Sequence, residues 1–307
     1  ISSSSYKRYT GRLNADYQAK SWLKVGANMS YSFAQMEAPS SQNDWGSSGN
    51  AFYIADNIAP IYPIYVRNAD GSFKYNDLGI QVYDTGTNTN QARKFSAGNP
   101  AIDLLLNKYN QETNYVNAKG YAIIDLPLDG LKFNTNMNIS TSDNRENNLY
   151  NPYFGSSSST NGAVSLEHYR RISLNQQYLF TYQHDFGMHN VDLLAGFETY
   201  HMKLQDFAGS MQSIYLANVA ELNNAIKYPA APTSYTDNYT TRGWLFRAQY
   251  NYAQKYFGSA SFRRDASSRF APGHQWGNFG SLGGAWIISK ENFMASTKSW
   301  LDELKYK

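Results

Sequence analysis

Charged residues gather near the C-terminal end of the chain, where Arg263, Arg264, Asp265 and Arg269 lie close together in the sequence. An arginine guanidinium and a carboxylate can form two parallel hydrogen bonds, which fix a loop or recognise a ligand. We expect this charge cluster at the end of a strand. There an Arg–Asp pair either holds the adjoining loop or faces the interior of the molecule, and the structural role is favoured.

A second group combines aromatic rings with amides and carboxylates. The segment 34–111 is rich in Tyr, Asn, Asp and Gly. Aromatic faces stack on the C–H faces of sugar rings, while amides and carboxylates bond to hydroxyls. The candidate substrate-binding residues of this loop are Trp45, Tyr53, Tyr62 and Tyr65. For each single residue the alternative, in which the loop folds on itself or docks a partner protein, is favoured.

No pattern of catalytic or metal-ligating residues stands out. The five histidines are scattered, and none has a helical His partner four residues away. His184 and His189 flank a predicted hairpin turn but have no third ligand nearby. Cysteine is absent, and no Gly-x-Ser-x-Gly motif occurs. We therefore predict no catalytic residue, no metal, no cofactor and no enzyme activity. The net charge of +3 comes from dispersed Lys and Arg, which predicts no nucleic-acid partner.

The elements that must position these residues are long amphipathic strands. From Leu23 to Phe33 every second residue is apolar, and the residues between are polar or glycine. An ordinary globular strand has about 5 to 6 residues, whereas a tilted strand needs about 9 to 11 to cross a bilayer. The segment therefore matches a transmembrane strand with one apolar face.

The same alternation repeats along the chain. It is clear in segments 131–140, 172–183 and 244–252, and weaker in 12–17, 115–124 and 191–201. We predict about nine strands, with a tenth starting at Leu304. Short turns near Lys20 and at 127–130, 186–190 and 253–255 alternate with long loops at 34–111, 143–167 and 208–240. A short helical turn is expected at 102–109. Outer-membrane barrels pair short periplasmic turns with long extracellular loops in this way.

Aromatic residues and open edges support the membrane interpretation. The chain has 26 tyrosines, many at predicted strand ends, where amphipathic rings form girdles at both rims of a barrel. About nine strands with two open edges cannot span a bilayer, because unpaired backbone groups are too costly in hydrocarbon. We therefore expect residues 1–307 to be one partial barrel domain of a larger protein.

The most specific residues follow the charge cluster. The run Arg264–Asp265–Ala266–Ser267–Ser268–Arg269–Phe270 precedes Trp276–Gly277–Asn278–Phe279, and Trp286 precedes Ile288–Ser289–Lys290–Glu291. These residues resemble the SusC/RagA family of TonB-linked outer-membrane proteins. Its members carry Arg-Asp-Gly-Ser-Ser-Arg-Phe, then Trp-Gly-x-Phe-x-Ser, then a Trp before Ile-Ser-x-Glu. Ala266 stands where the family usually has Gly, so it is strained if that site needs a positive φ.

This resemblance implies an all-β fold in the Gram-negative outer membrane. Residues 1–307 would supply about nine to ten of about 22 antiparallel strands of a transmembrane barrel. It further implies TonB-dependent import of oligosaccharides or peptides, with a SusD-like surface lipoprotein as partner. Outer-membrane lipid would surround the wall, and the TonB complex would act through a missing N-terminal region. The plug domain is absent from this chain, which would supply barrel wall and substrate-facing loops.

Two alternatives stay open. A soluble extracellular carbohydrate-binding module would share the aromatic and Asn-rich loops, but its strands should be short, about 5 to 6 residues. A passive porin-type barrel would share the strands, but not the signature between Arg263 and Phe293.

Overall fold

All strands of the described chain belong to one antiparallel sheet. The computed structural model describes residues 4–38, 53, 56, 61–85, 99–155 and 157–307. Within these residues the sheet has eleven strands, and the neighbours follow chain order except that β7 pairs only with β6. The strands are β1 (Ser5–Lys20), β2 (Leu23–Ala38), β3 (Lys108–Asp125), β4 (Leu131–Tyr150), β5 (Ala163–Phe186), β6 (His189–Ile214), β7 (Ala225–Lys227), β8 (Thr233–Tyr252), β9 (Tyr256–Ser267), β10 (Trp276–Ile287) and β11 (Lys305–Tyr306).

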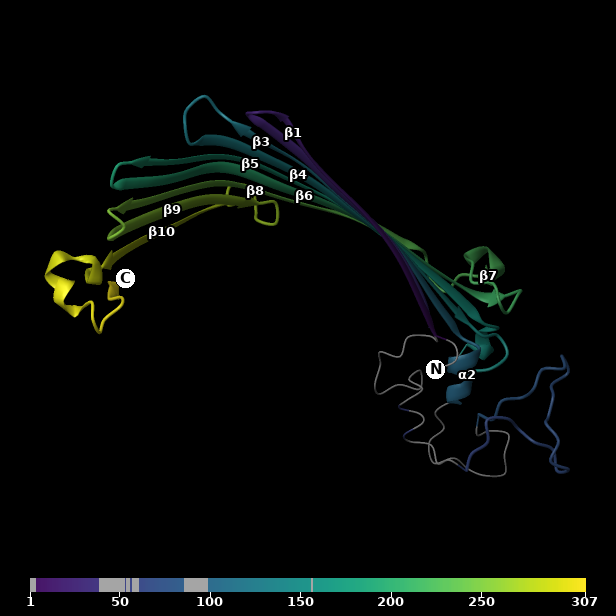
Figure 1. The fold of residues 1–307 in the computed structure, drawn as a ribbon. Coiled ribbons are helices and arrows are strands. Elements are labelled where there is room, and N and C mark those ends of the chain that lie inside the picture. The colour runs from purple at the N-terminus through teal and green to yellow at the C-terminus, as the bar shows by residue number, and fades with distance from the viewer. Residues whose placement is uncertain (1–3, 39–52, 54–55, 57–60, 86–98, 156) are drawn as a thin grey trace.

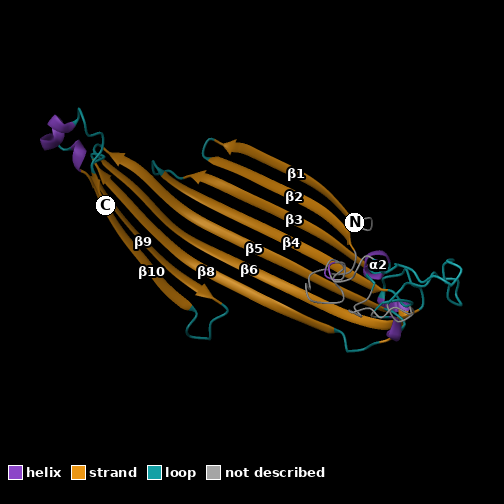
Figure 2. Ribbon diagram, turned by 90° about the horizontal axis from the view of Figure 1, so that it is seen from below, coloured by secondary structure: helices purple, strands orange, loops and turns teal. Residues whose placement is uncertain are grey.

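The sheet is a single curved layer. Figure 2 shows the strands side by side, and Figure 1 shows that the layer arches and twists strongly. The main strands β1 to β10, apart from the short β7, run for 12 to 26 residues. This length exceeds the strand length of about 5 to 6 residues expected of the soluble-module alternative, and the sheet confirms the predicted partial antiparallel barrel wall. Within the described residues, no helix has the length and apolar character needed to cross a membrane.

From β2 to β9, leaving out the short β7, an unbroken register aligns the apolar residues of successive strands. Side chains alternate between the two faces of a strand, so direct cross-strand partners share a face. One row of partners runs Phe133, Phe180, Ala195, Phe246, Phe262 from β4 to β9. We call the face that carries this row the apolar face, and the opposite one the polar face.

The apolar face lacks a covering layer along the middle of the strands. In the described part of the chain, the helices lie at the ends of the strands, as Figure 2 shows. Met137, Phe180 and Phe246 lie in the middle of the face and are 45 to 50% exposed. Fully burying such a side chain is worth about 1.5–3 kcal/mol, so covering the half that is still exposed would contribute roughly half of that. A face of this extent is therefore stable only against an apolar environment.

The predicted alternation of connections is confirmed, with one correction. Short turns join β1 to β2, β3 to β4, β5 to β6 and β8 to β9 at one end of the sheet. The longer connections from β2 to β3, from β4 to β5 and from β6 to β8 lie at the other end, beside α2 and β7 in Figure 1. The connection from β10 to β11, residues 288–304, instead lies at the end with the short turns. However, the predicted loops at 143–167 and 208–240 are too long, because β4 continues to Tyr150, β5 begins at Ala163 and β6 continues to Ile214.

Two small cores stabilise the end with the long connections. Leu149, Val164 and Ile214 at the strand tips are covered by Ala225 and by the segment with the 3-10 helix η2 (Leu222–Asn224). The second core joins Tyr83 to Ile102 of α2 (Pro100–Leu105). The predicted helical turn at 102–109 is thus present but starts earlier, since Asn99 caps it and Pro100 occupies its first turn. Three further 3-10 helices are η1 (Ser158–Thr160), η3 (Ile288–Lys290) and η4 (Asn292–Thr297).

Aromatic side chains line the apolar face at the short-turn end. His189 contacts Tyr252 with ring centroids 4.8 Å apart, Tyr252 stacks on Tyr256 at 6.2 Å, and Tyr256 stacks on Trp286 at 6.1 Å. The predicted placement of tyrosines at strand ends is confirmed for this group.

Candidate substrate-facing surface

The polar face is a continuous array of amide and hydroxyl groups. Asn117 donates to Ser140 at 2.8 Å across β3 and β4, and Asn136 donates to Gln177 at 3.3 Å across β4 and β5. The hydroxyls of Thr10 and Ser32 lie 3.1 Å apart. Amides and hydroxyls both donate and accept hydrogen bonds, so this face can interact with water and with polar solutes.

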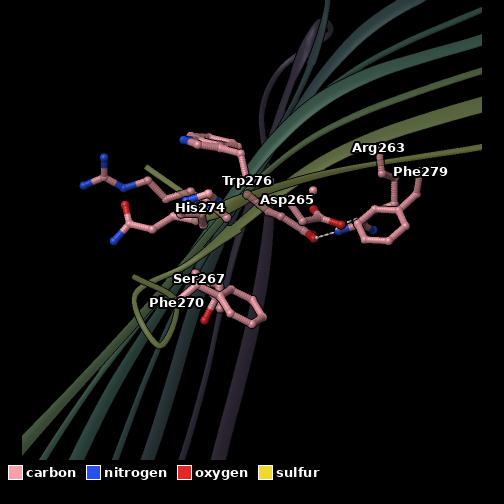
Figure 3. Close-up of a pocket in the computed structure, with 14 residues that line it drawn as sticks. Arg263, Asp265, Ser267, Phe270, His274, Trp276 and Phe279 are labelled. Atoms are coloured by element: carbon pink, nitrogen blue, oxygen red, sulfur yellow. Dashed lines mark hydrogen bonds and ion pairs between the residues drawn. The ribbon is translucent and has the colours of Figure 1, made fainter. Parts of the chain in front are cut away.

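Arg263 organises the charged part of the polar face. Its Nε donates to Asp265 Oδ2 at 3.2 Å and its Nη2 to Asp265 Oδ1 at 3.1 Å. The same guanidinium forms an ion pair with Glu198, two strands away on β6. Figure 3 shows Arg263, Asp265 and their dashed contacts. The arginine therefore connects β6 to β9 across the intervening strand β8.

Gly243 on β8 makes this connection possible. The register places Gly243 directly between Glu198 and Asp265. A Cβ at position 243 would overlap the Asp265 carboxylate and crowd Arg263. Glycine is thus required here by a close approach of side chains, since its φ is not in the left-handed region.

A cavity adjoins the Arg263 cluster. Its volume is about 510 Å³, and its lining includes Glu198, Arg263, Asp265, Phe270, His274 and Trp276. Figure 3 shows Phe270 and Trp276 on opposite sides of the pocket. The cavity thus combines a charge network with aromatic walls, a combination suited to polar ligands that carry flat or C–H surfaces.

The turn between β9 and β10 is held by a second arginine. Both Nη atoms of Arg269 contact the Asp237 carboxylate on β8, with Nη1 to Oδ1 at 3.0 Å. The guanidinium beside Asp237 holds the pKa of that carboxyl below its usual range. This geometry matches the structural role favoured for a bidentate Arg–Asp pair, but Asp237 takes the place of Asp265 as the partner of Arg269.

The predicted charge cluster is therefore divided. Arg263 and Asp265 contact one another, and Arg269 pairs elsewhere. Arg264 projects on the apolar face, where its guanidinium lies 5.1 Å from the centre of the Trp276 ring. Alternate residues of a strand point to opposite faces, so neighbours 263 and 264 cannot share a site. Ala266 has no positive φ and pairs with Trp276 in the ladder, so the anticipated strain is absent.

The aromatic candidates occupy different positions. Trp45 lies outside the described residues. Tyr53 and Tyr62 are half-buried. Tyr65 packs on Tyr83 with ring centroids 4.7 Å apart and meets Phe73 edge-on at 5.8 Å. Tyr65 thus belongs to the folded core of its loop, and substrate contact at these residues stays a prediction.

Asn99 is a buried residue of this loop to which the sequence interpretation gave no role. Its amide donates to Ile64 O at 2.7 Å and to Asp84 O at 3.0 Å, while its Oδ1 accepts from Ala101 N at 3.0 Å. The side chain therefore fastens the 61–85 segment to the start of α2. The available signal was an Asn directly before a Pro, which is typical of a helix N-terminus.

The described residues contain no group of three or more His, Asp or Glu side chains arranged to hold a metal ion. The polar face itself presents hydrogen-bond donors, acceptors and charges that can bind polar solutes. The geometry and the sheet together define the class of the chain: a wall segment of an outer-membrane-type β-barrel with a polar interior face.

Comparisons with known proteins agree with this class. The chain is 27% identical over 308 residues to TonB-dependent receptor P3 of Formosa agariphila, covering 97% of the chain and 28% of the relative. It is 23% identical to TonB-dependent receptor SusC of Bacteroides thetaiotaomicron, covering 96% of the chain and 29% of SusC. No family model matches. The chain thus spans between a quarter and a third of the length of these curated relatives.

A solved structure shares the fold. The RagAB peptide transporter matches with a TM-score of 0.75 and 22% identity, over 98% of this chain and 32% of that chain. At this identity the match establishes the fold. Together with the curated relatives, it confirms the resemblance of this chain to TonB-dependent receptors of the SusC/RagA type.

Proposed function

We propose that residues 1–307 form part of the barrel domain of a TonB-dependent importer in the Gram-negative outer membrane. The plug domain and the remaining strands lie outside this chain in the proposal. The carrying observation is the single-layer sheet with one uncovered apolar face and one hydrogen-bonded polar face. Such a sheet is stable where lipid covers one face and a polar lumen the other.

The proposed cargo is an oligosaccharide or a peptide. The SusC and RagAB relatives support a nutrient importer that acts with a SusD-like surface lipoprotein and the TonB complex. The amide-rich polar face and the cavity beside Arg263 fit both cargoes, because each presents hydroxyl or amide groups together with apolar surface. In this proposal the wall and loops contact the cargo and perform no chemistry on it.

Fractionation and growth of the native host test the proposal. The protein should be recovered in the outer-membrane fraction, and deletion of its gene should abolish growth on one class of oligosaccharide or peptide. Deletion of the energising TonB gene should abolish the same growth. Recovery in the soluble fraction would instead favour the carbohydrate-binding module, while uptake that does not need TonB would favour the passive porin.

A further inference from the structure

Basic residues follow the apolar stretch on neighbouring strands of the sheet. On the apolar face, Arg170 comes directly after Ile172 of β5, Arg242 after Trp244 of β8, and Arg264 after Phe262 of β9. On β6, Lys203 follows the last apolar position after two intermediate polar ones. Each of the four side chains therefore lies beyond the apolar stretch of its own strand, toward the long connections, directly after it on β5, β8 and β9 and six residues after Phe197 on β6. We call Arg170, Lys203, Arg242 and Arg264 the basic row.

The register places the members of the basic row near one another. Arg242 pairs with Thr199 on β6 and with Ala266 on β9. Ala266 is two residues along β9 from Arg264, so Arg242 and Arg264 are diagonal neighbours on the same face. Lys203 is the partner of Ile172, two residues from Arg170. On each successive strand from β5 to β9, the basic residue lies closer to the short-turn end of the sheet. The end of the apolar stretch is displaced in the same direction. Strands in a barrel are tilted by about 35–45°, so positions displaced in this sense lie at similar depths in a membrane.

Charges are segregated between the two faces at this level. In the described residues, the ionisable side chains on the apolar face of β6, β8, β9 and β10 beyond the apolar stretch are all basic, and His201 joins the row there. The polar face carries the acidic residues of the same strands, Glu198, Asp206, Asp237 and Asp265. On β5, Arg170 is the register partner of Asp143 on β4, which contacts His168. The register partners of Lys203, Arg242 and Arg264 on β5, β6, β8 and β9 include no carboxylate.

The contacts of the basic row agree with this. In the described part of the chain, none of its four members forms an ion pair with a carboxylate, whereas Arg263 and Arg269 both do. Arg170, Arg242 and Arg264 are exposed and Lys203 is half-buried. The Arg264 guanidinium lies over the Trp276 ring, which leaves its outer edge available.

We propose that the basic row binds the phosphate groups of anionic lipid headgroups in the outer leaflet of the membrane. Guanidinium groups pair with phosphate oxygens through two parallel hydrogen bonds, and long basic side chains extend from the apolar zone to the headgroup level. Trp276 beside Arg264 is the residue type enriched at this interface. The inference rests on the proposed placement in the outer membrane, and it adds a lipid site on the apolar face. Arg242 of the row and Trp276 lie at the edge of this site and also line the cavity beside Arg263.

Lipid binding to the purified detergent-solubilised protein tests the proposal. The probe is lipid A, and bound molecules are counted by native mass spectrometry. Removing three cations in K203Q/R242Q/R264Q should lower lipid A occupancy roughly fivefold, and the wild-type occupancy should fall as salt is raised. The control K24Q/K119Q/R171Q removes three cations from the polar face and should keep near wild-type occupancy.

Each other outcome overturns the proposal. Unchanged occupancy in the basic-row variant, or an equal loss in the control, would show that the row is not the lipid site. Displacement of lipid A by inorganic phosphate, at an ionic strength matched with sodium chloride, would show a site for free phosphate. If the triple variant does not fold, R264Q is compared with R171Q. If the basic-row variant binds lipid A as well as the wild type but the protein is found in the outer-membrane fraction, only the lipid site is refuted and the proposed importer stands. If the protein is absent from that fraction, both proposals are refuted.

Discussion

Three glycines of the sheet lie between side chains that meet across a strand. Asp16 and Tyr121 meet across Gly26, Leu179 and Leu245 lie on either side of Gly196, and Arg263 reaches Glu198 across Gly243. In each case a Cβ would overlap a neighbouring side chain. These glycines have no positive φ, so they are used for close approach and not for a turn.

Gly243→Ala should therefore destabilise the barrel wall. The added methyl group displaces the Asp265 carboxylate and breaks the Arg263 contacts that join β6 to β9. Overpacking of this kind costs about 1–3 kcal/mol. The measurement is the midpoint temperature at which the folded protein loses its faster migration in SDS gels. Gly258→Ala is the matched control, since nothing lies within 4 Å of a Cβ at that position. An equal midpoint for both variants would contradict this role for Gly243.

The composition of the Arg263 site was only partly predictable from sequence. The dense run of charges correctly predicted the strand that carries the site. Because side chains alternate along β9, Arg263 and Asp265 lie on one face and Arg264 lies on the other. The partner Glu198 is 65 residues away from Arg263 along the chain. It joins the site only through the register of β6 with β8 and of β8 with β9, which no local pattern specifies.

At the scale of elements, the hairpins were predictable and the strand lengths were not. Alternation ends near Ile139 on β4, because the next positions on the apolar face are the polar residues Thr141, Asp143 and Arg145. The ladder nevertheless continues to Tyr150, where Leu149 enters the small core with Val164 and Ile214. Beyond the apolar stretch, the strands are stabilised by backbone hydrogen bonds and by this core. Neither produces an alternation of apolar and polar residues in the sequence, so the full strand length could not be predicted from it.

A carboxylate fastens the segment after β10 to the β8–β9 hairpin. Glu291 accepts hydrogen bonds from Tyr256 Oη at 2.6 Å, from Trp286 Nε1 at 3.2 Å and from Lys255 Nζ at 3.1 Å. These donors, Tyr256 first, hold the pKa of Glu291 below its ordinary value of 4.5. The contribution of the carboxylate to stability is thus fully present above pH 4.5 and lost as the pH falls through the lower pKa of the folded state.

A fluorine NMR titration can detect this transition. With 5-fluorotryptophan incorporated, the Trp286 resonance should shift with a midpoint below pH 4.5. W286F assigns the resonance, and E291Q should remove its pH dependence. A midpoint above the ordinary glutamate value, or an unchanged titration in E291Q, would show that Glu291 does not fasten this segment as a carboxylate.

For the whole molecule, the two faces of the sheet differ in chemistry but not in exposure. Ala248 on the apolar face and Gln249 on the polar face of β8 are adjacent, and both are exposed in the isolated sheet. Ala248 lies between Leu193 and Ala260, whereas Gln249 lies between Asp192 and Ser259. In the proposed barrel wall, the surroundings make these neighbours differ in accessibility, because lipid would cover one face and water the other.

Single-cysteine labelling measures that difference directly. The chain contains no cysteine, so a thiol placed in it gives an unambiguous signal from this segment. In isolated outer membranes, Gln249→Cys should react with a charged, water-soluble maleimide, and Ala248→Cys should not, because lipid excludes the reagent from the apolar face. After denaturation in SDS both variants should react equally, which controls for intrinsic thiol reactivity. Equal labelling of the two positions in intact membranes would mean that water reaches both faces, and the sheet would then have to be covered by protein instead of lipid.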